Sequence, residues 1–258
     1  MRVTFPALMR DAWRLWRRDW ELLTAVAGLF VFLPALAIAM LIPDMPAPPN
    51  SGEAVPGSVT MTAYEQGLTQ WMVSYGGWQL AAQAIVLFGQ FAIVALYLSG
   101  DQPAAGKALM AAARRYPLLL LAGLIIAVPI AAVLLLAQAL PLLMAAFFVL
   151  VFWVLARTIA LAPTLLAEAP VGALAAITRS LHLTRGNTLA LAAAVMTVIL
   201  AMTIATWPFE QIDAWMLVRA PNPIARAIID AIAAIITGLG GIAMSLLQVA
   251  AYRRLRTR

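Results

Sequence analysis

Residues 117–139, PLLLLAGLIIAVPIAAVLLLAQA, contain no charged side chain. A helix needs about 20 apolar residues to cross the hydrocarbon core of a bilayer, so this stretch is long enough to span a membrane. Five other stretches are similarly apolar, and the full set is 22–42, 78–99, 117–139, 142–162, 188–207 and 224–250. The sequence therefore predicts an all-α polytopic membrane protein, in which residues 1–258 form a single domain with a bundle of six transmembrane helices.

The composition supports this fold class. Hydrophobic residues make up 64% of the chain and charged residues 11%, with a mean hydropathy of +0.93, whereas soluble domains contain about 25% charged residues. Only helices and closed barrels satisfy all backbone hydrogen bonds inside a bilayer, and the six stretches lack the two-residue alternation of barrel strands. The chain has no cysteine and one histidine, so we expect no disulfide, no metal site and no cofactor.

The distribution of positive charge predicts the orientation of the helices. Fifteen of the 17 Lys and Arg residues lie in alternate gaps between the spans, on one predicted side. Because Lys and Arg are enriched in cytoplasmic loops, both termini are expected in the cytoplasm. The net charge of +6 is then directed at anionic headgroups, so membrane phospholipids are the expected partners and nucleic acid is not.

The segment 1–21 has the pattern of an amphipathic helix that lies in the membrane interface. Apolar residues recur at steps of three and four, and arginines occupy the other side. The apolar side consists of Phe5, Leu8, Met9, Ala12, Trp13, Trp16 and Trp20, and the basic side of Arg10, Arg14, Arg17 and Arg18. The alternative is that this helix packs against the bundle or against a partner protein.

Three further segments connect the predicted spans. Residues 43–77 form an external loop, which is either a plain connector or a lid, with a short helix at 61–75. Residues 100–116 and 163–187 are expected to be cytoplasmic interfacial segments that contain short helices at 103–115 and 170–184.

The second cytoplasmic segment carries a resemblance to a known family. The residues concerned are Arg157, Pro163, Glu168, the run AITRS at 176–180, the run LTRGN at 183–187 and the closing AYRRLR at 251–256. Together they resemble the YciC-like inner-membrane family, which is similar to the membrane domain of some glycerophosphoryl diester phosphodiesterases. The resemblance implies a non-catalytic six-helix domain in the inner (plasma) membrane of a bacterial cell. His182 stands where that family more often has Trp or a basic residue, which argues against a catalytic role for it.

The same segment holds the main candidate site. Two interpretations are open for its charged and polar residues: a structural latch that ties the interfacial helix to the bundle, or a site for a phospholipid headgroup. Gly186 is expected to end the interfacial helix, because glycine readily adopts the left-handed conformation. Glu168 and Arg179 would meet if one helix continued between them, but Pro170 favours a break. The candidate residues are Arg157, Glu168, Arg179, Ser180, Arg185 and Gly186.

A second set of candidates lies within the predicted spans. Arg226 and Asp230 are four residues apart and are expected to pair on one face of the last span. Gln83 and Gln90 are seven apart, so they share a helix face and are expected to form hydrogen bonds across the bundle. A coupling role for Asp230 in proton or cation transport is the alternative.

These patterns favour a non-enzymatic membrane protein, a lipid-binding or partner-binding scaffold in envelope or lipid homeostasis, whose protein partner would be membrane-bound or cytoplasmic. No phosphate loop, dinucleotide fingerprint, nucleophile elbow or zinc-binding helix occurs, so no catalytic residue is predicted, and an intramembrane enzyme is the weakest alternative. The main alternative to the scaffold is a small transporter or permease subunit. It would need a cavity near the midplane lined by Gln83, Gln90, Arg157 or Asp230.

Overall fold

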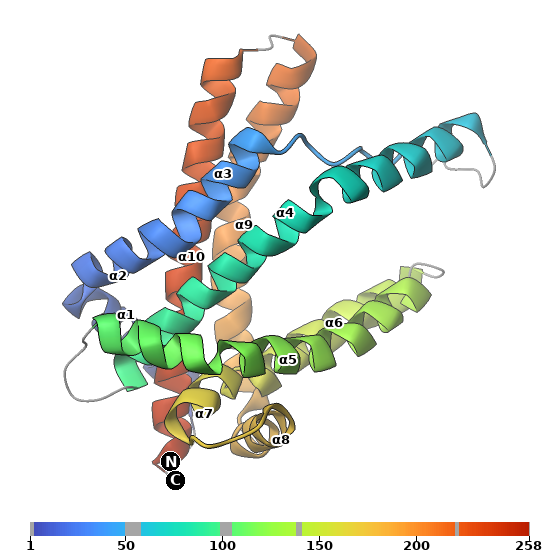
Figure 1. Ribbon diagram of the computed structural model, residues 1–258. Coiled ribbons are helices and arrows are strands. Elements are labelled where there is room, and N and C mark those ends of the chain that lie inside the picture. The colour runs from blue at the N-terminus through green and yellow to red at the C-terminus, as the bar shows by residue number, and fades with distance from the viewer. Residues whose placement is uncertain (1–2, 50–57, 99–104, 138–140, 220–221, 258) are drawn as a thin grey trace.

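A computed structural model describes residues 3–49, 58–98, 105–137, 141–219 and 222–257, and all regular structure in these ranges is helical (Figure 1). The elements are α1 (Phe5–Arg18), α2 (Trp20–Ala27), the π-helical turn η1 (Gly28–Phe32), α3 (Leu33–Leu41), α4 (Val59–Leu98), α5 (Ala105–Ala137), α6 (Pro141–Thr158), α7 (Leu161–Ala167), α8 (Ala173–Leu183), α9 (Thr188–Arg219) and α10 (Pro223–Arg256).

Six helical segments are long and apolar enough to cross a membrane, which confirms the predicted all-α fold class. They are Trp20–Leu41, Val59–Leu98, Ala105–Ala137, Leu143–Ala167, Thr188–Met216 and Pro223–Arg256. The segment Ala105–Ala137 is the most exposed, because only 6% of its most apolar window is buried inside the protein. A helix with so much exposed apolar surface needs lipid or protein around it, as expected for a multi-pass membrane protein.

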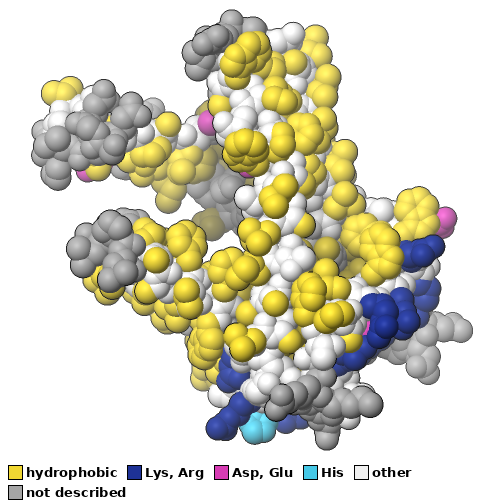
Figure 2. Space-filling model, turned by 180° about the vertical axis from the view of Figure 1, so that it is seen from behind, with side chains coloured by type: hydrophobic (Ala, Val, Ile, Leu, Met, Phe, Trp, Pro, Cys, Tyr) yellow, Lys and Arg dark blue, Asp and Glu magenta, His cyan; other side chains and the backbone are white. Residues whose placement is uncertain are grey.

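The helices converge at one end of the molecule and diverge at the other (Figure 1). The hairpin of α9 and α10 stands at a large angle to the hairpin of α5 and α6, and α4 runs diagonally between them. Both termini lie at the converging end, beside α7 and α8. Figure 2 shows Lys and Arg side chains gathered around this end, while the diverging arms are mostly hydrophobic. We call this end the basic end.

The packed core also lies toward the basic end. The buried residues of α4 fall between Gly89 and Tyr97, in its last quarter, and those of α10 between Ala234 and Leu255. Small residues on one face of α10 allow α4 and α10 to pack closely. These residues, Ala234, Gly238, Gly241 and Ser245, are all buried, as their spacing along the helix predicts.

The first span contains the π-helical turn just before Pro34. Proline has no backbone N–H and cannot donate to the carbonyl four residues earlier, at Phe30, so the regular hydrogen-bond ladder is interrupted there. At this turn α4 approaches closely: a β-carbon built on Gly89 would lie 2.5 Å from the β-carbon of Phe30. The irregular turn and the glycine together define where the first two spans cross.

The predicted external loop 43–77 is wrong in its second half. Helix α4 begins at Val59 and continues without a break to Leu98, so it absorbs the short helix expected at 61–75; residues 50–57 lie outside the described ranges. No proline occurs within α4, and a glycine in a helix costs only about 1 kcal/mol relative to alanine. Gly76 and Gly77 therefore do not end the helix.

The separate interfacial helix predicted at 103–115, within the segment 100–116, is also wrong. Residues from Ala105 onward form one helix with the following span and pass through Pro117; residues 100–104 lie outside the described ranges. The turn around Pro117 is held in place because the Tyr116 hydroxyl donates a hydrogen bond to the backbone carbonyl of Ala84 on α4. In the segment 163–187, by contrast, α8 is a distinct helix.

Candidate functional site

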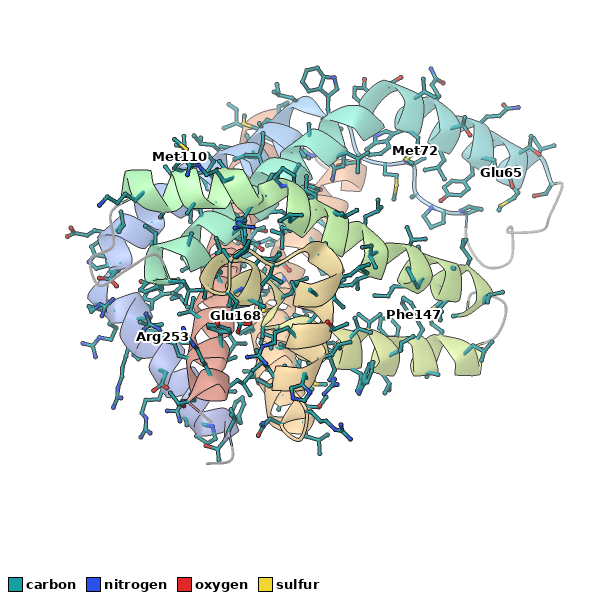
Figure 3. The ribbon with its side chains drawn as sticks, turned by 60° about the horizontal axis from the view of Figure 1, so that its bottom comes forward. Glu65, Met72, Met110, Phe147, Glu168 and Arg253 are labelled. Carbon is teal, nitrogen blue, oxygen red and sulfur yellow. The ribbon has the colours of Figure 1, made fainter. Side chains whose placement is uncertain are left out.

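Glu168 connects three elements at the basic end. It follows the last residue of α7, and the peptide bond between Ala169 and Pro170 is cis. The Nε of Arg179 on α8 donates a hydrogen bond to Glu168 Oε2 at 3.0 Å, and the Tyr252 hydroxyl on α10 donates to Oε1 at 3.1 Å. The sequence allowed Glu168 and Arg179 to meet only if one helix continued between them, and Pro170 favoured a break. They meet because the chain breaks between them and α8 folds back. Figure 3 shows Glu168 near the centre of this end.

Helix α8 also binds the end of α6 through hydroxyl groups. The Ser180 and Thr184 side chains donate hydrogen bonds to the backbone carbonyl of Arg157, at 2.9 and 3.2 Å, and both residues are buried. The last carbonyls of a helix have no partner within that helix, so α8 supplies donors for one of them. Ser180 was a predicted site residue, whereas Thr184 was missed. Their spacing of four places both on one face of α8.

The turn between α8 and α9 contacts the N-terminal end of the chain. Gly186 has a φ of +82°, a backbone conformation that residues other than glycine seldom adopt. The next residue, Asn187, is buried, and its Oδ1 accepts a hydrogen bond from the backbone N–H of Val3 at 3.2 Å. Its contact with Val3 spans 184 positions of the chain and has no counterpart in the local sequence pattern.

Unlike Glu168 and Arg179, the Arg157 side chain forms no ion pair with any described residue. It is half-buried, its Nε is buried without a hydrogen-bond partner in the described ranges, and its guanidinium carbon lies 5.7 Å from the centroid of the Trp153 ring. Both oxygens of Glu168 already accept from Arg179 and Tyr252. The contacts of α8 with Arg157 therefore involve its backbone carbonyl, and its guanidinium forms no ion pair in the described part of the chain. Arg185 is exposed and likewise forms no ion pair within those ranges.

Few acidic groups balance the cations of the basic end. Asp11 pairs with Arg254 at 2.6 Å, and Asp19 pairs with Arg18 at 2.9 Å; the hydrogen bond to Asp19 raises the pKa of Arg18. Among the described residues, the following Lys and Arg residues form no ion pair: Arg10, Arg17, Lys107, Arg114, Arg115, Arg157, Arg185, Arg253 and Arg256. This end therefore presents a net positive surface (Figure 2).

A second charged cluster lies at the opposite ends of α3, α9 and α10. Arg226 does not pair with Asp230 as predicted. Its guanidinium binds Asp44, which follows α3, and its Nε lies 3.4 Å from Asp213 Oδ1 on α9. The acids on neighbouring elements approach more directly than the one on the same helix. Asp44, Arg226 and Asp230 line a cavity of about 420 Å³.

The two glutamines of α4 do not form the predicted hydrogen bonds across the bundle within the described ranges. Gln83 is exposed, and the Gln90 amide lies beside Gly241, 3.2 Å from where a β-carbon would stand. Neither lines the cavity that contains Asp230, and Arg157 belongs to the basic end. The polar residues that a transport pathway would need are therefore spread over separate parts of the molecule.

Comparison of the chain with protein-family models, with curated proteins and with solved structures finds no match. The described residues contain no group of three or more His, Cys, Asp or Glu side chains that could hold a metal ion.

Proposed function

We propose that this protein is a non-enzymatic inner-membrane scaffold that binds anionic phospholipid headgroups at its basic end. The observation that carries the proposal is the half-buried guanidinium of Arg157, which has no anionic partner among the described residues. An arginine near the end of a span binds a phosphate with two parallel hydrogen bonds more readily than it stays unpaired. The resemblance to the YciC-like family supports the same role.

The surroundings of Arg157 favour a phosphate over a protein carboxylate. Glu168, the nearest acid in sequence, is held by Arg179 and Tyr252, so it is not free to move to Arg157. The exposed Arg185 follows Thr184, whose hydroxyl contacts the Arg157 backbone. It adds a second cation close to the proposed headgroup, and each cation near a membrane surface strengthens binding to anionic lipid by about 1 kcal/mol.

Native mass spectrometry in mild detergent tests the proposal with purified wild-type protein and three variants. Arg157→Gln removes the charge, Arg157→Lys keeps the charge but loses the planar fork, and Arg256→Gln removes an exposed charge elsewhere on the basic end. We expect retained phosphatidylglycerol to fall about tenfold in Arg157→Gln, since a charged hydrogen bond contributes about 1.5–3 kcal/mol. Arg157→Lys should give an intermediate value and Arg256→Gln little change. Unchanged retention in Arg157→Gln, together with a lower melting temperature, would instead make Arg157 a structural residue.

A further inference from the structure

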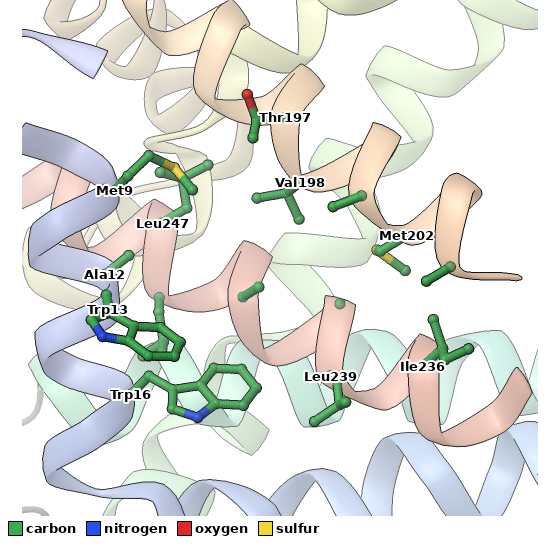
Figure 4. A pocket seen from close by; sticks show the side chains of 15 residues that line it. Met9, Ala12, Trp13, Trp16, Thr197, Val198, Met202, Ile236, Leu239 and Leu247 are labelled. Atoms are coloured by element: carbon green, nitrogen blue, oxygen red, sulfur yellow. The ribbon is translucent and has the colours of Figure 1, made fainter. Parts of the chain in front are cut away.

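An apolar groove lies between α1 and the hairpin of α9 and α10, apart from Arg157. It encloses about 390 Å³. Figure 4 shows Trp13 and Trp16 extending from α1 toward α10, with Val198 and Met202 of α9 on the opposite wall and Leu239 of α10 below. Its lining is almost entirely hydrocarbon, and Trp13 is 59% exposed.

The length of the groove matches one leaflet of a bilayer. On α10 its lining runs from Leu247, near the basic end, to Ile236, which is about 16 Å at 1.5 Å per residue. Half of a hydrocarbon core is about 15 Å. The tryptophans near the Leu247 end of the groove belong to an amphipathic helix, and tryptophan is enriched at the height of the headgroups. One end of the groove thus lies at the headgroups and the other near the midplane.

Two exposed arginines lie on α1 near the tryptophans that line the groove. Arg10 and Arg17 stand three residues before and four residues after Trp13, so they follow the same edge of α1. Both are exposed, and neither forms an ion pair within the described part of the chain. An apolar groove of leaflet length with cations near its headgroup end is complementary to a lipid with an anionic headgroup.

We propose that this groove binds one acyl chain of an anionic phospholipid, whose phosphate contacts Arg10 and Arg17. The Met202 side chain on the wall of the groove packs closely against α10 at Gly240: a β-carbon there would come within 2.0 Å of the Met202 sulfur. Glycine at this position therefore leaves room for the methionine. Arg157 does not line this groove, so we expect a substitution at either site to leave binding at the other unchanged.

Photocrosslinking of the full chain in phosphatidylcholine nanodiscs tests the groove. The probe is phosphatidylglycerol with a diazirine in the middle of one chain, and the products are mapped by peptide mass spectrometry. We expect crosslinks to concentrate on peptides of α1, α9 and α10 that line the groove, above the level at the lipid-facing Leu124 and Val128 of α5. Equal labelling of the groove and of α5 would mean bulk lipid contact and would overturn the proposal.

Two sets of variants separate the chain from the headgroup. Ala201→Phe and Ala205→Phe each place a ring in the groove at an exposed lining position, and both should abolish the crosslinks, whereas Ala132→Phe on the exposed face of α5 should not. The double variant Arg10→Gln, Arg17→Gln should weaken phosphatidylglycerol labelling about 25-fold, since each arginine contributes a factor of about five; Lys107→Gln is the matched control. Melting temperatures confirm that each variant is folded. Unchanged crosslinks in folded Ala201→Phe and Ala205→Phe, or equal labelling by a phosphatidylcholine probe, would refute the site.

Discussion

The backbone N–H of Val3 donates a hydrogen bond to the side chain of Asn187, which joins the start of the chain to the start of α9. Val3 and Asn187 are both buried, and Val3 packs in the same core cluster as Leu191 and Tyr252. This contact anchors α1, which forms one wall of the apolar groove, to the hairpin that forms the other.

Asn187→Ala should detach the N-terminal segment. It leaves a buried backbone N–H without its acceptor, which costs about 1–3 kcal/mol. We expect a lower melting temperature and faster proteolysis before α2. Asn222→Ala is the control, because Asn222 also accepts backbone hydrogen bonds, at the exposed start of α10, without a contact to α1. Equal proteolysis of α1 in the two variants would contradict the anchoring role.

Glu168→Ala should lower the free energy of unfolding more than removal of either of its hydrogen-bond partners, Tyr252 or Arg179. Glu168 accepts one hydrogen bond from Tyr252 and one from Arg179, and a hydrogen bond to a charged group contributes about 1.5–3 kcal/mol. Because Arg179 is 47% exposed, its share is discounted for solvent screening. We expect SDS-induced unfolding to show a loss of about 2 kcal/mol for Glu168→Ala and about 1 kcal/mol for Tyr252→Phe.

A double-mutant cycle checks that Tyr252 acts through Glu168. In the Glu168→Ala background, Tyr252→Phe should cost less than in the wild type, since the hydroxyl has already lost its acceptor. Fully additive effects would show that Tyr252 stabilises α10 independently of the latch.

Gly89→Ala should weaken the crossing of α4 with the first span. The new β-carbon would lie 2.5 Å from the β-carbon of Phe30 and 3.3 Å from its backbone carbonyl. Neither group can move without its helix, so we expect the overpacking to cost about 1–3 kcal/mol in a thermal or SDS unfolding experiment.

The matched control lies in the same helix. A β-carbon at Gly77 meets nothing within 4 Å, so Gly77→Ala should leave stability unchanged or raise it by up to about 1 kcal/mol through helix propensity. If both alanines had the same effect, close packing at Gly89 would not account for the crossing.

The sequence predicts the six apolar helices well because a span is defined locally, by the length and polarity of one segment. Helix ends are predicted less well, since backbone hydrogen bonds continue wherever no residue interrupts them. Val59 to Gly77 is polar enough to resemble a loop but contains nothing that stops a helix. The left-handed backbone conformation of Gly186 was predictable, because glycine adopts it more readily than any other residue type.

Long-range partners were not predictable in this way. Arg226 has an acid four residues away, yet its guanidinium binds Asp44, 182 positions earlier, and only the packing of α3 beside α10 brings the two together. The latch was one of two interpretations for Arg157, and the contacts with α8 are made by its backbone carbonyl. A sequence pattern identifies residue types and helix faces, but not which atom of a residue a neighbouring element meets.

The orientation of the chain can be tested directly, because the sequence contains no cysteine and single cysteines can be introduced without background. Helix α4 has 40 residues, about 60 Å at 1.5 Å per residue, which is twice the hydrocarbon core. We therefore expect Gln70, in the first third of α4, to lie beyond the core on the side opposite the basic end. With a cytoplasmic basic end, Gln70→Cys should react with an impermeant maleimide in intact spheroplasts, whereas Thr257→Cys, after α10, should react only after lysis. Leu124→Cys, on the apolar face of α5, should react in neither state. Reaction of Gln70→Cys and Thr257→Cys from the same side would refute the six-span topology, and reaction of Thr257→Cys alone in intact spheroplasts would reverse the orientation.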